Sequence, residues 1–202
     1  MPNISATPER IAQSIAEQGY CIVDNALPQH ICQGLYQRIT ELPASTFKGM
    51  GIGRGGAFHV DKSYRSDKSH WLTGENQAEQ DYLSWMETLR LAVNRQLFMG
   101  LLDYEAHFAH YAPKSFYKRH LDAFKGASSR KLTTVYYLNP NWSKVDGGEL
   151  LMYQDDKSKS PFKTIIPQNN RLVVFLSDAF PHEVLPAQKD RYSIAGWFRL
   201  KA

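Results

Sequence analysis

The half of the sequence that follows Gly100 has the pattern of a series of short β-strands, and this pattern constrains the fold more than any other feature. Apolar, aromatic and β-branched residues alternate or cluster over a few positions at a time, and turn residues at 139–141 and 145–148 separate them. Short strands with turns between them are typical of a β-sandwich or a jelly roll. The predicted strands are residues 104–111, 131–138, 149–153, 162–166, 171–176, 182–185 and 192–200.

The residues before Gly100 show helical periodicity instead. Thr7 as N-cap, Pro8 as the first helical residue and Gly19 after the last turn predict a helix over 8–18. A short buried strand follows, and then two further helices. Their predicted ranges are 20–23 for the strand and 28–42 and 81–99 for the helices. Since helices come first and strands afterwards, we expect an α+β, mainly β fold: a double-stranded β-helix (jelly roll) with the N-terminal helices packed on one outer face.

The length of 202 residues suits one domain with a sizeable core. We expect residues 1–202 to form a single domain. Residues 1–100 would be a helical scaffold that also carries a mobile Gly-rich segment at about 48–71, and residues 101–202 would be the jelly-roll core. Long loops of this kind often cover sites.

Composition narrows the range of partners. The net charge is +4 and the pI is near 9.0, but no dense block of Lys and Arg indicates nucleic acid. Cys21 and Cys32 are the only cysteines and form no C-x-x-C pair, which is typical of a reducing compartment. The first ten residues lack a signal-peptide pattern, and no apolar run is long enough to span a membrane. We therefore expect a cytoplasmic protein with neither nucleic acid nor membrane as its partner.

One group of residues carries metal chemistry. His120 and Asp122 are two positions apart, so in an extended strand both would point to the same face. His182 is the natural third ligand from a distant strand. Two histidines and one carboxylate on one face, with other positions open, bind non-haem Fe(II) for oxygen chemistry. Arg191 adds a guanidinium, which pairs bidentately with a carboxylate and suits the far end of a dicarboxylic co-substrate.

Two similar motifs are weaker candidates. His59 and Asp61 repeat the His-x-Asp spacing, but they follow a Gly-rich run that is a poor support for rigid ligands. That run contains a G-x-G-x-x-G at positions 51–56, yet no apolar strand leads into it and no helix follows. We therefore favour His120 and Asp122 and reject a dinucleotide-binding interpretation.

Taken together, these segments resemble the iron(II)- and 2-oxoglutarate-dependent prolyl 4-hydroxylases. The resemblance runs from about Gly49 to the C-terminus, and it is closest to the group of oxygen-sensing prolyl hydroxylases and their bacterial relatives. Ala195 departs from the animal enzymes, which carry a hydroxyl residue there, and residues 114–116 replace a Gly-rich spacing. The shared segments are residues 117–122, 135–139, 147–150 after Trp142, 181–184 with Pro186, and Arg191-Tyr192 with Trp197, together with residues 65–68 and Trp71.

The resemblance implies a role for each site residue. His120, Asp122 and His182 would hold iron(II), and with Arg191 they form the catalytic set. Arg191 and Tyr137 would bind the distal carboxylate of 2-oxoglutarate. The remaining co-substrate pocket would be lined by Tyr111, Leu150 and Trp197, and the substrate side by Arg65, Asp67 and Trp197.

Some of these residues have a plain alternative when they are considered without the family. Trp197 is more typical of a core position, and Tyr111 and Tyr137 also fit as core strand tyrosines. His107 and His110 are ordinary strand residues to which we assign no role.

The family implies an oxidoreductase that hydroxylates C4 of a prolyl residue in a protein and releases succinate and CO2. Its cofactors would be Fe(II), 2-oxoglutarate and O2, with ascorbate as a stimulant. Elongation factor Tu is the protein substrate to which the bacterial relatives point. Two alternatives remain open from the residues: a 2-oxoglutarate oxygenase acting on a free amino acid or other small molecule, and a non-catalytic metal-binding β-barrel module.

Overall fold

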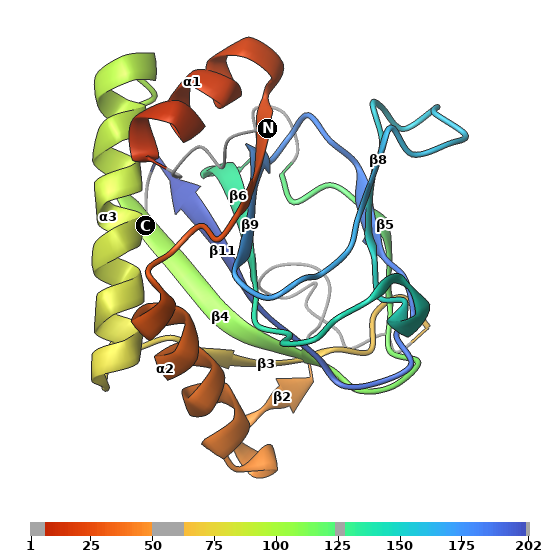
Figure 1. Cartoon of the computed structure of the whole chain (residues 1–202). Coiled ribbons are helices and arrows are strands. Elements are labelled where there is room, and N and C mark those ends of the chain that lie inside the picture. The colour runs from red at the N-terminus through yellow and green to blue at the C-terminus, as the bar shows by residue number, and fades with distance from the viewer. Residues whose placement is uncertain (1–6, 50–62, 124–127, 201–202) are drawn as a thin grey trace.

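The computed structural model describes residues 7–49, 63–123 and 128–200, and two antiparallel sheets dominate it. The large sheet has the strand order β1-β9-β6-β11-β4-β3-β2, and the small sheet has the order β5-β10-β7-β8. Figure 1 shows the three helices on one side of the large sheet and the small sheet on its other side. The predicted jelly roll with helices on one outer face is therefore confirmed.

The helices are α1 (Pro8–Gln18), α2 (Gln29–Glu41) and α3 (Gln77–Leu97), and the bounds predicted for α1 are confirmed. The Thr7 hydroxyl accepts a hydrogen bond from the Arg10 N–H at the start of α1. Gly19 ends the helix with φ +80°, a conformation that favours glycine. Helix α2 is one residue shorter at each end than predicted.

The predicted start of α3 at residue 81 is wrong, because the helix begins four residues earlier. Asn76 caps the first turn, and its side chain accepts a hydrogen bond from the Glu79 N–H. Glu79 is fully buried and also accepts hydrogen bonds from Arg38 and from the N–H groups of Thr73 and Gly74. This cap fixes the helix start although the apolar stripe begins later.

The predicted strands are all present, with ends shifted by at most one residue, and β2, β3 and β5 are additional to the predicted ranges. Those of the large sheet are β1 (Tyr20–Asp24), β2 (Lys48–Gly49), β3 (Lys68–Trp71), β4 (Asp103–Tyr111), β6 (Arg130–Tyr137), β9 (Arg171–Leu176) and β11 (Arg191–Arg199). Those of the small sheet are β5 (Tyr117–His120), β7 (Leu150–Met152), β8 (Lys163–Ile165) and β10 (His182–Val184). Two short 3₁₀ helices are Ala44–Thr46 and Lys144–Asp146.

The Gly-rich segment expected at 48–71 is described only at its two ends. Its ends contain β2, which pairs with β3, and β3, which also pairs with β4, whereas residues 63–67 form a turn and an isolated bridge. Residues 50–62, which include His59, Asp61 and the G-x-G-x-x-G motif, lie outside the described residues.

The two faces of the large sheet border two separate apolar clusters. Alternate residues of β4, β6 and β11, such as Phe108, Tyr136 and Phe198, pack with the helices. The residues between them, such as Tyr111 and Tyr137, pack with Leu150 of the small sheet in the second cluster. The space between the sheets is therefore lined from both sides by inward-facing side chains, and the candidate site lies there. None of the helices in the described ranges is long and apolar enough to cross a membrane.

Candidate active site

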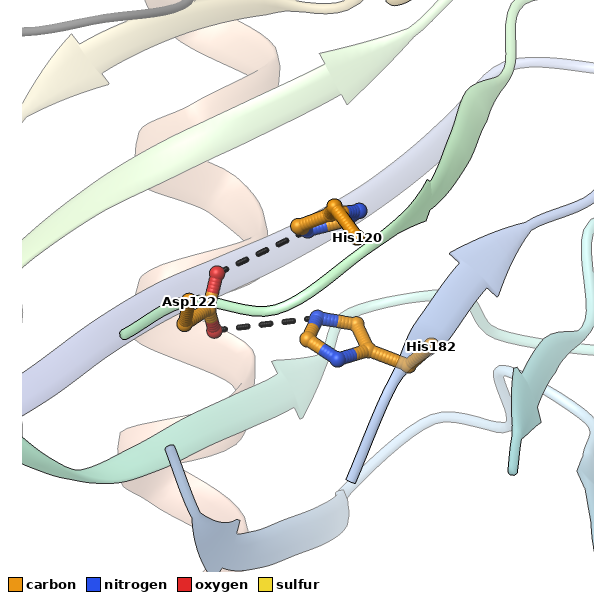
Figure 2. A group of neighbouring side chains, drawn as sticks. All are labelled: His120, Asp122 and His182. Carbon is orange, nitrogen blue, oxygen red and sulfur yellow. Dashed lines mark ion pairs between the residues drawn. The ribbon is translucent and has the colours of Figure 1, made fainter. Parts of the chain in front are cut away.

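His120, Asp122 and His182 come together between the sheets, and their ligand atoms all lie within 4.8 Å of one another. His120 ends β5 and His182 begins β10, and the two are paired across these antiparallel strands. Asp122 lies beyond β5 in a bend, so the expectation of one extended strand through both ligands is wrong. The Asp122 carboxylate still reaches between the imidazoles, 3.5 Å from His120 Nε2 and 3.6 Å from His182 Nε2 (Figure 2).

Hydrogen bonds fix the tautomer of both histidines. His120 Nδ1 lies 2.7 Å from the Lys118 carbonyl oxygen, and His182 Nδ1 lies 3.0 Å from that of Phe180. A carbonyl oxygen only accepts, so each Nδ1 carries a proton, and in the neutral tautomer that this selects the lone pair lies on Nε2. Both Nε2 atoms face the carboxylate, which is the arrangement that a metal ion requires.

The electrostatics of the three groups suit a cation. Burial lowers the pKa of His182 to about 4, and His120 nearby acts in the same direction. Burial alone would raise the pKa of Asp122, but His182 and His120 outweigh it and hold the pKa below its usual value. Asp122 Oδ2 also accepts a hydrogen bond from Thr133 Oγ1 on β6, at 2.8 Å. At neutral pH the site thus presents the ionised Asp122 carboxylate and the neutral His182 imidazole, with the His120 imidazole beside them. Two imidazoles and one carboxylate are the donor set that binds non-haem iron(II).

The buried guanidinium of Arg191 also lies between the two sheets, next to Tyr111 and Tyr137. Arg191 is 1% exposed, and its Nε donates to the Gly148 carbonyl oxygen at 2.9 Å. A Cβ on Gly148 would lie 3.0 Å from Arg191 Cδ, so the glycine makes room for this side chain. Within the described ranges, no carboxylate forms an ion pair with Arg191. A buried cation without a carboxylate partner is costly, and it suits an anionic ligand.

Two tyrosines flank Arg191. Its Cζ atom lies 4.9 Å from the ring centroid of Tyr111 and 5.0 Å from that of Tyr137. The Tyr137 hydroxyl is buried and makes no hydrogen bond of normal geometry with the described residues. Burial raises the pKa of Tyr137, although Arg191 opposes this, so the hydroxyl stays protonated and can donate. Leu150 is buried in the same cluster as both tyrosines.

Arg65 and Asp67, predicted for the substrate side, are buried and form a bidentate ion pair at 2.8 and 2.6 Å. Arg65 Cζ lies 4.0 Å above the ring of Tyr117, and the Tyr117 ring stacks on His120 with centroids 3.6 Å apart. Sequence reasoning assigned no role to Tyr117 or to Thr133, although both contact metal-ligand candidates. Neither contact has a local signal in the sequence, because each depends on how distant segments pair.

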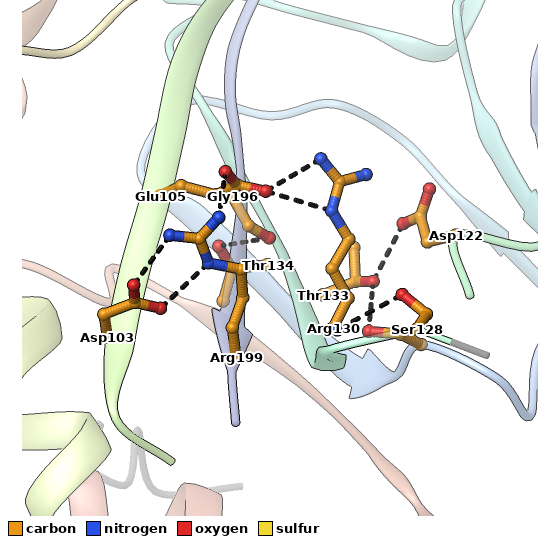
Figure 3. Close-up of polar contacts among 10 residues, drawn as sticks. Asp103, Glu105, Asp122, Ser128, Arg130, Thr133, Thr134, Gly196 and Arg199 are labelled. Atoms are coloured by element: carbon orange, nitrogen blue, oxygen red, sulfur yellow. Dashed lines mark hydrogen bonds and ion pairs between the residues drawn. The ribbon is translucent and has the colours of Figure 1, made fainter. Parts of the chain in front are cut away.

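Trp197 contacts a group of charged side chains through Arg130, and Figure 3 shows Asp103, Glu105, Arg130 and Arg199 of this group. Arg130 Cζ lies 3.6 Å above the Trp197 ring, and Arg130 pairs with Glu105 at 2.8 Å. Arg199 bridges Glu105 and Asp103 at 2.7 and 2.6 Å. The indole N–H of Trp197 is buried without a hydrogen bond of normal geometry in the described residues, and it is among the groups that lower the pKa of Asp122.

The model of the 2OG-Fe(II) oxygenase superfamily matches residues 106–199, which span all three candidate ligands and Arg191. Human prolyl hydroxylase EGLN3 is 30% identical over 199 residues, which cover 94% of this chain and 82% of the relative. The chain belongs to the 2OG-Fe(II) oxygenase superfamily. The predicted family and the predicted cofactors, iron(II), 2-oxoglutarate and O2, are therefore confirmed.

Two solved structures share the fold over nearly the whole chain. A prolyl-4-hydroxylase from Pseudomonas putida has a TM-score of 0.85 and 35% sequence identity, and the match covers 97% of this chain and all of that one. A prolyl hydroxylase from Trichoplax adhaerens, in complex with a peptide fragment of the hypoxia-inducible factor oxygen degradation domain, has a TM-score of 0.81 and 29% identity, covering 95% and 90%. Other relatives are much longer: the chain spans 28% of the Caenorhabditis elegans hypoxia-inducible factor prolyl hydroxylase and 48% of human Egl nine homolog 1.

Proposed function

We propose that the protein is an iron(II)- and 2-oxoglutarate-dependent dioxygenase that hydroxylates C4 of a prolyl residue in a protein substrate. The observation that carries this proposal is the buried Arg191 guanidinium, which has no carboxylate partner in the described ranges and lies in the same inter-sheet space as the His120–Asp122–His182 set. A dicarboxylic co-substrate would supply the missing partner, while its other end approaches the metal ligands.

The roles proposed for the chain's residues follow from their hydrogen-bonding state. His120 and His182 offer Nε2 lone pairs and Asp122 a carboxylate, so these three would hold the iron. Arg191 would pair with the distal carboxylate of 2-oxoglutarate, and the free Tyr137 hydroxyl would donate to that same group. Tyr111 and Leu150 would line the co-substrate pocket and exclude water from it. When bound, iron(II) with O2 would supply the oxidising chemistry that turns 2-oxoglutarate into succinate and CO2 and adds one oxygen atom to the prolyl C4–H bond.

A protein is the substrate class that the relatives support. The Trichoplax adhaerens relative binds a peptide fragment, and the Pseudomonas putida relative is a prolyl-4-hydroxylase. On this chain, Trp197 and the Arg65–Asp67 pair would line the peptide side. We propose elongation factor Tu as the first substrate to test, a cytoplasmic setting, and stimulation by ascorbate. The two free, buried thiols Cys21 and Cys32 support a reducing compartment.

The test is mass spectrometry of a bacterial lysate, and in parallel of purified elongation factor Tu, after aerobic incubation with the protein, iron(II), 2-oxoglutarate and ascorbate. We expect one proline to gain one oxygen atom, with succinate formed in equal amount. His182→Ala should form neither product. His30→Ala, which changes an exposed histidine on α2, should match the wild type.

Each outcome separates the alternatives. Succinate formed by the wild type alone, without a hydroxylated protein, would contradict a protein substrate and support a small-molecule oxygenase. Bound iron with neither product would contradict catalysis and support a metal-binding module.

A further inference from the structure

Tyr117 and His120 lie on the same face of β5 only because this strand carries an extra residue. His120 pairs with His182, and Tyr117 pairs with Val184. The partners on β10 are two positions apart, whereas the residues on β5 are three apart. One extra residue on one strand of an antiparallel pair is a β-bulge. In a regular strand, residues three apart point to opposite faces. The bulge therefore directs Tyr117 toward the metal-ligand candidate.

The resulting contact covers one face of the His120 imidazole. The two ring centroids are 3.6 Å apart and the planes differ by 15°, which is a stacked pair. The hydrogen bond from His120 Nδ1 to Lys118 fixes the ring edge, and the stack fixes the ring plane. Together they determine where Nε2 points.

The other side of Tyr117 carries a cation that is itself held in place. Arg65 Cζ lies 4.0 Å from the Tyr117 ring centroid, within cation–π range. Two hydrogen bonds to Asp67 orient the Arg65 guanidinium, and both side chains are buried. Burial alone would lower the pKa of Arg65, but the hydrogen bonds to Asp67 outweigh it and raise the pKa. A continuous series of contacts thus runs from Asp67 through Arg65 and Tyr117 to His120.

The backbone around this series is also joined. The Ser66 N–H donates to the Phe116 carbonyl oxygen at 3.1 Å, and the Phe116 N–H donates to Ser66 Oγ at 3.1 Å. The Lys118 N–H donates to the Tyr64 carbonyl oxygen at 2.9 Å, and the Tyr64 hydroxyl donates to that of Arg119 at 3.0 Å. Residues 64–66 therefore follow the edge of β5 like an additional strand of the small sheet. Directly after them, β3 belongs to the large sheet, so this segment joins both sheets beside His120.

We propose that Tyr117 is a positioning residue for His120, and that it couples the Arg65–Asp67 ion pair to the metal centre. The proposal rests on the proposed metal site. Its consequence is reciprocal: loss of the ion pair weakens metal binding, and metal binding makes the 64–67 segment more resistant to opening.

The first test uses cobalt(II) alone as an anaerobic probe of the whole chain, with its affinity and visible spectrum as readouts. Tyr117→Leu should weaken cobalt(II) binding about ten-fold and shift the spectrum, because residues that orient metal ligands typically contribute 10–100-fold in affinity. Tyr117→Phe keeps the stacked ring and should remain within about two-fold of the wild type. Tyr36→Leu, which changes a partly buried tyrosine of the helical cluster, is the matched control for lost packing.

The second test asks whether Arg65 acts through Tyr117. Arg65→Met should weaken cobalt(II) binding, and the double variant Arg65→Met/Tyr117→Leu should be no weaker than Tyr117→Leu. Hydrogen exchange of the Ser66 and Lys118 amides should slow when cobalt(II) is added to the wild type, and it should slow much less in Tyr117→Leu.

The outcomes separate this inference from the proposed function. If cobalt(II) affinity in the wild type is the same as in Asp122→Ala, the proposed metal site fails. If that site is intact but Tyr117→Leu binds cobalt(II) with wild-type affinity and spectrum, the positioning role is wrong. Equal losses in Tyr117→Leu and Tyr36→Leu would also contradict it, because packing alone would then explain both.

Discussion

The large sheet has a helix face, which packs against the helices, and an inner face, which is turned toward the small sheet. The same strands form both faces, but buried polar groups are hydrogen-bonded on the helix face and partly unpaired on the inner face. On the helix face, the Tyr104 hydroxyl contacts those of Tyr82 and Thr134 at 3.0 and 2.7 Å, and the Tyr136 hydroxyl donates to Asn170. On the inner face, three buried polar atoms have no hydrogen bond of normal geometry within the described residues: His107 Nε2, Tyr137 Oη and Trp197 Nε1.

Burying a polar group without a partner costs about 1–3 kcal/mol, so the inner face is built at the expense of stability. Arg191 is part of the same pattern, since its buried guanidinium has no carboxylate partner there. The helix face stabilises the fold, whereas the inner face keeps its hydrogen-bonding capacity for ligands. Substitutions on the two faces should therefore have opposite consequences.

The largest expected effect is on turnover. Asp122→Ala removes the anionic metal ligand and should abolish the conversion of 2-oxoglutarate to succinate, measured by mass spectrometry of the small molecules. Asp81→Ala, on the outside of α3, is the control and should retain turnover. Succinate formation by Asp122→Ala at the wild-type rate would remove this carboxylate from the site.

A substitution on the helix face should lower the stability of the fold and leave ligand binding unchanged. Phe198 is fully buried against the helices, and Phe198→Ala should lower the free energy of unfolding by about 3–5 kcal/mol, measured by urea denaturation. The variant that remains folded should bind 2-oxoglutarate with wild-type affinity. A large loss of that affinity would contradict the separation of the two faces.

Arg191→Met, on the inner face, should have the opposite effect to Phe198→Ala: it should weaken 2-oxoglutarate binding without lowering stability. Hydrogen bonds to charged groups contribute up to about 3 kcal/mol, so 2-oxoglutarate affinity should fall roughly 100-fold by calorimetry. The free energy of unfolding without ligands should stay the same or rise, because a buried unpaired charge is removed. Marked destabilisation of the ligand-free variant would show that Arg191 is a structural cation instead.

The smallest effect concerns pH. Burial lowers the pKa of His107 to about 4, and that of His182 to about 4 as well, from an ordinary value of 6.5. Between pH 6.5 and 4 the unfolded chain therefore binds protons that the folded chain does not, and stability falls as the pH falls. For each histidine, the free energy of unfolding changes by at most about 1.4 kcal/mol per pH unit.

The variant His107→Met should lessen this slope in urea denaturation of the metal-free protein at pH 7, 6 and 5. An unchanged slope would contradict the lowered pKa of His107 in the folded protein.

The sequence was most informative where a structure depends on neighbouring residues. Helix α1 was predicted to the residue because Thr7, Pro8 and Gly19 are local signals at both of its ends. The start of α3 was missed because its cap, Asn76 with Glu79, precedes the apolar stripe used to find the helix. The metal-ligand candidates were found because a His-x-Asp pair next to strand sequence, with a distant His, forms the donor set for iron(II), and the family resemblance then supported the choice.

What the sequence did not reveal depends on register between distant strands. The extra residue in β5 becomes visible only when β5 is paired with β10, and this bulge brings Tyr117 onto His120. His107 was assigned no role, yet pairing of β4 with β11 and β3 places it opposite Ala195 and Trp71, on the inner face. Local alternation identifies two faces but does not say which face is the interior of the site.

The most direct test of the account is the iron content of the protein after anaerobic dialysis against iron(II) and 2-oxoglutarate, measured for the wild type, His182→Ala and Phe198→Ala. The account predicts one iron per chain in the wild type and in folded Phe198→Ala, and none in His182→Ala. One iron per chain in His182→Ala would contradict the assignment of the metal centre to the inner face.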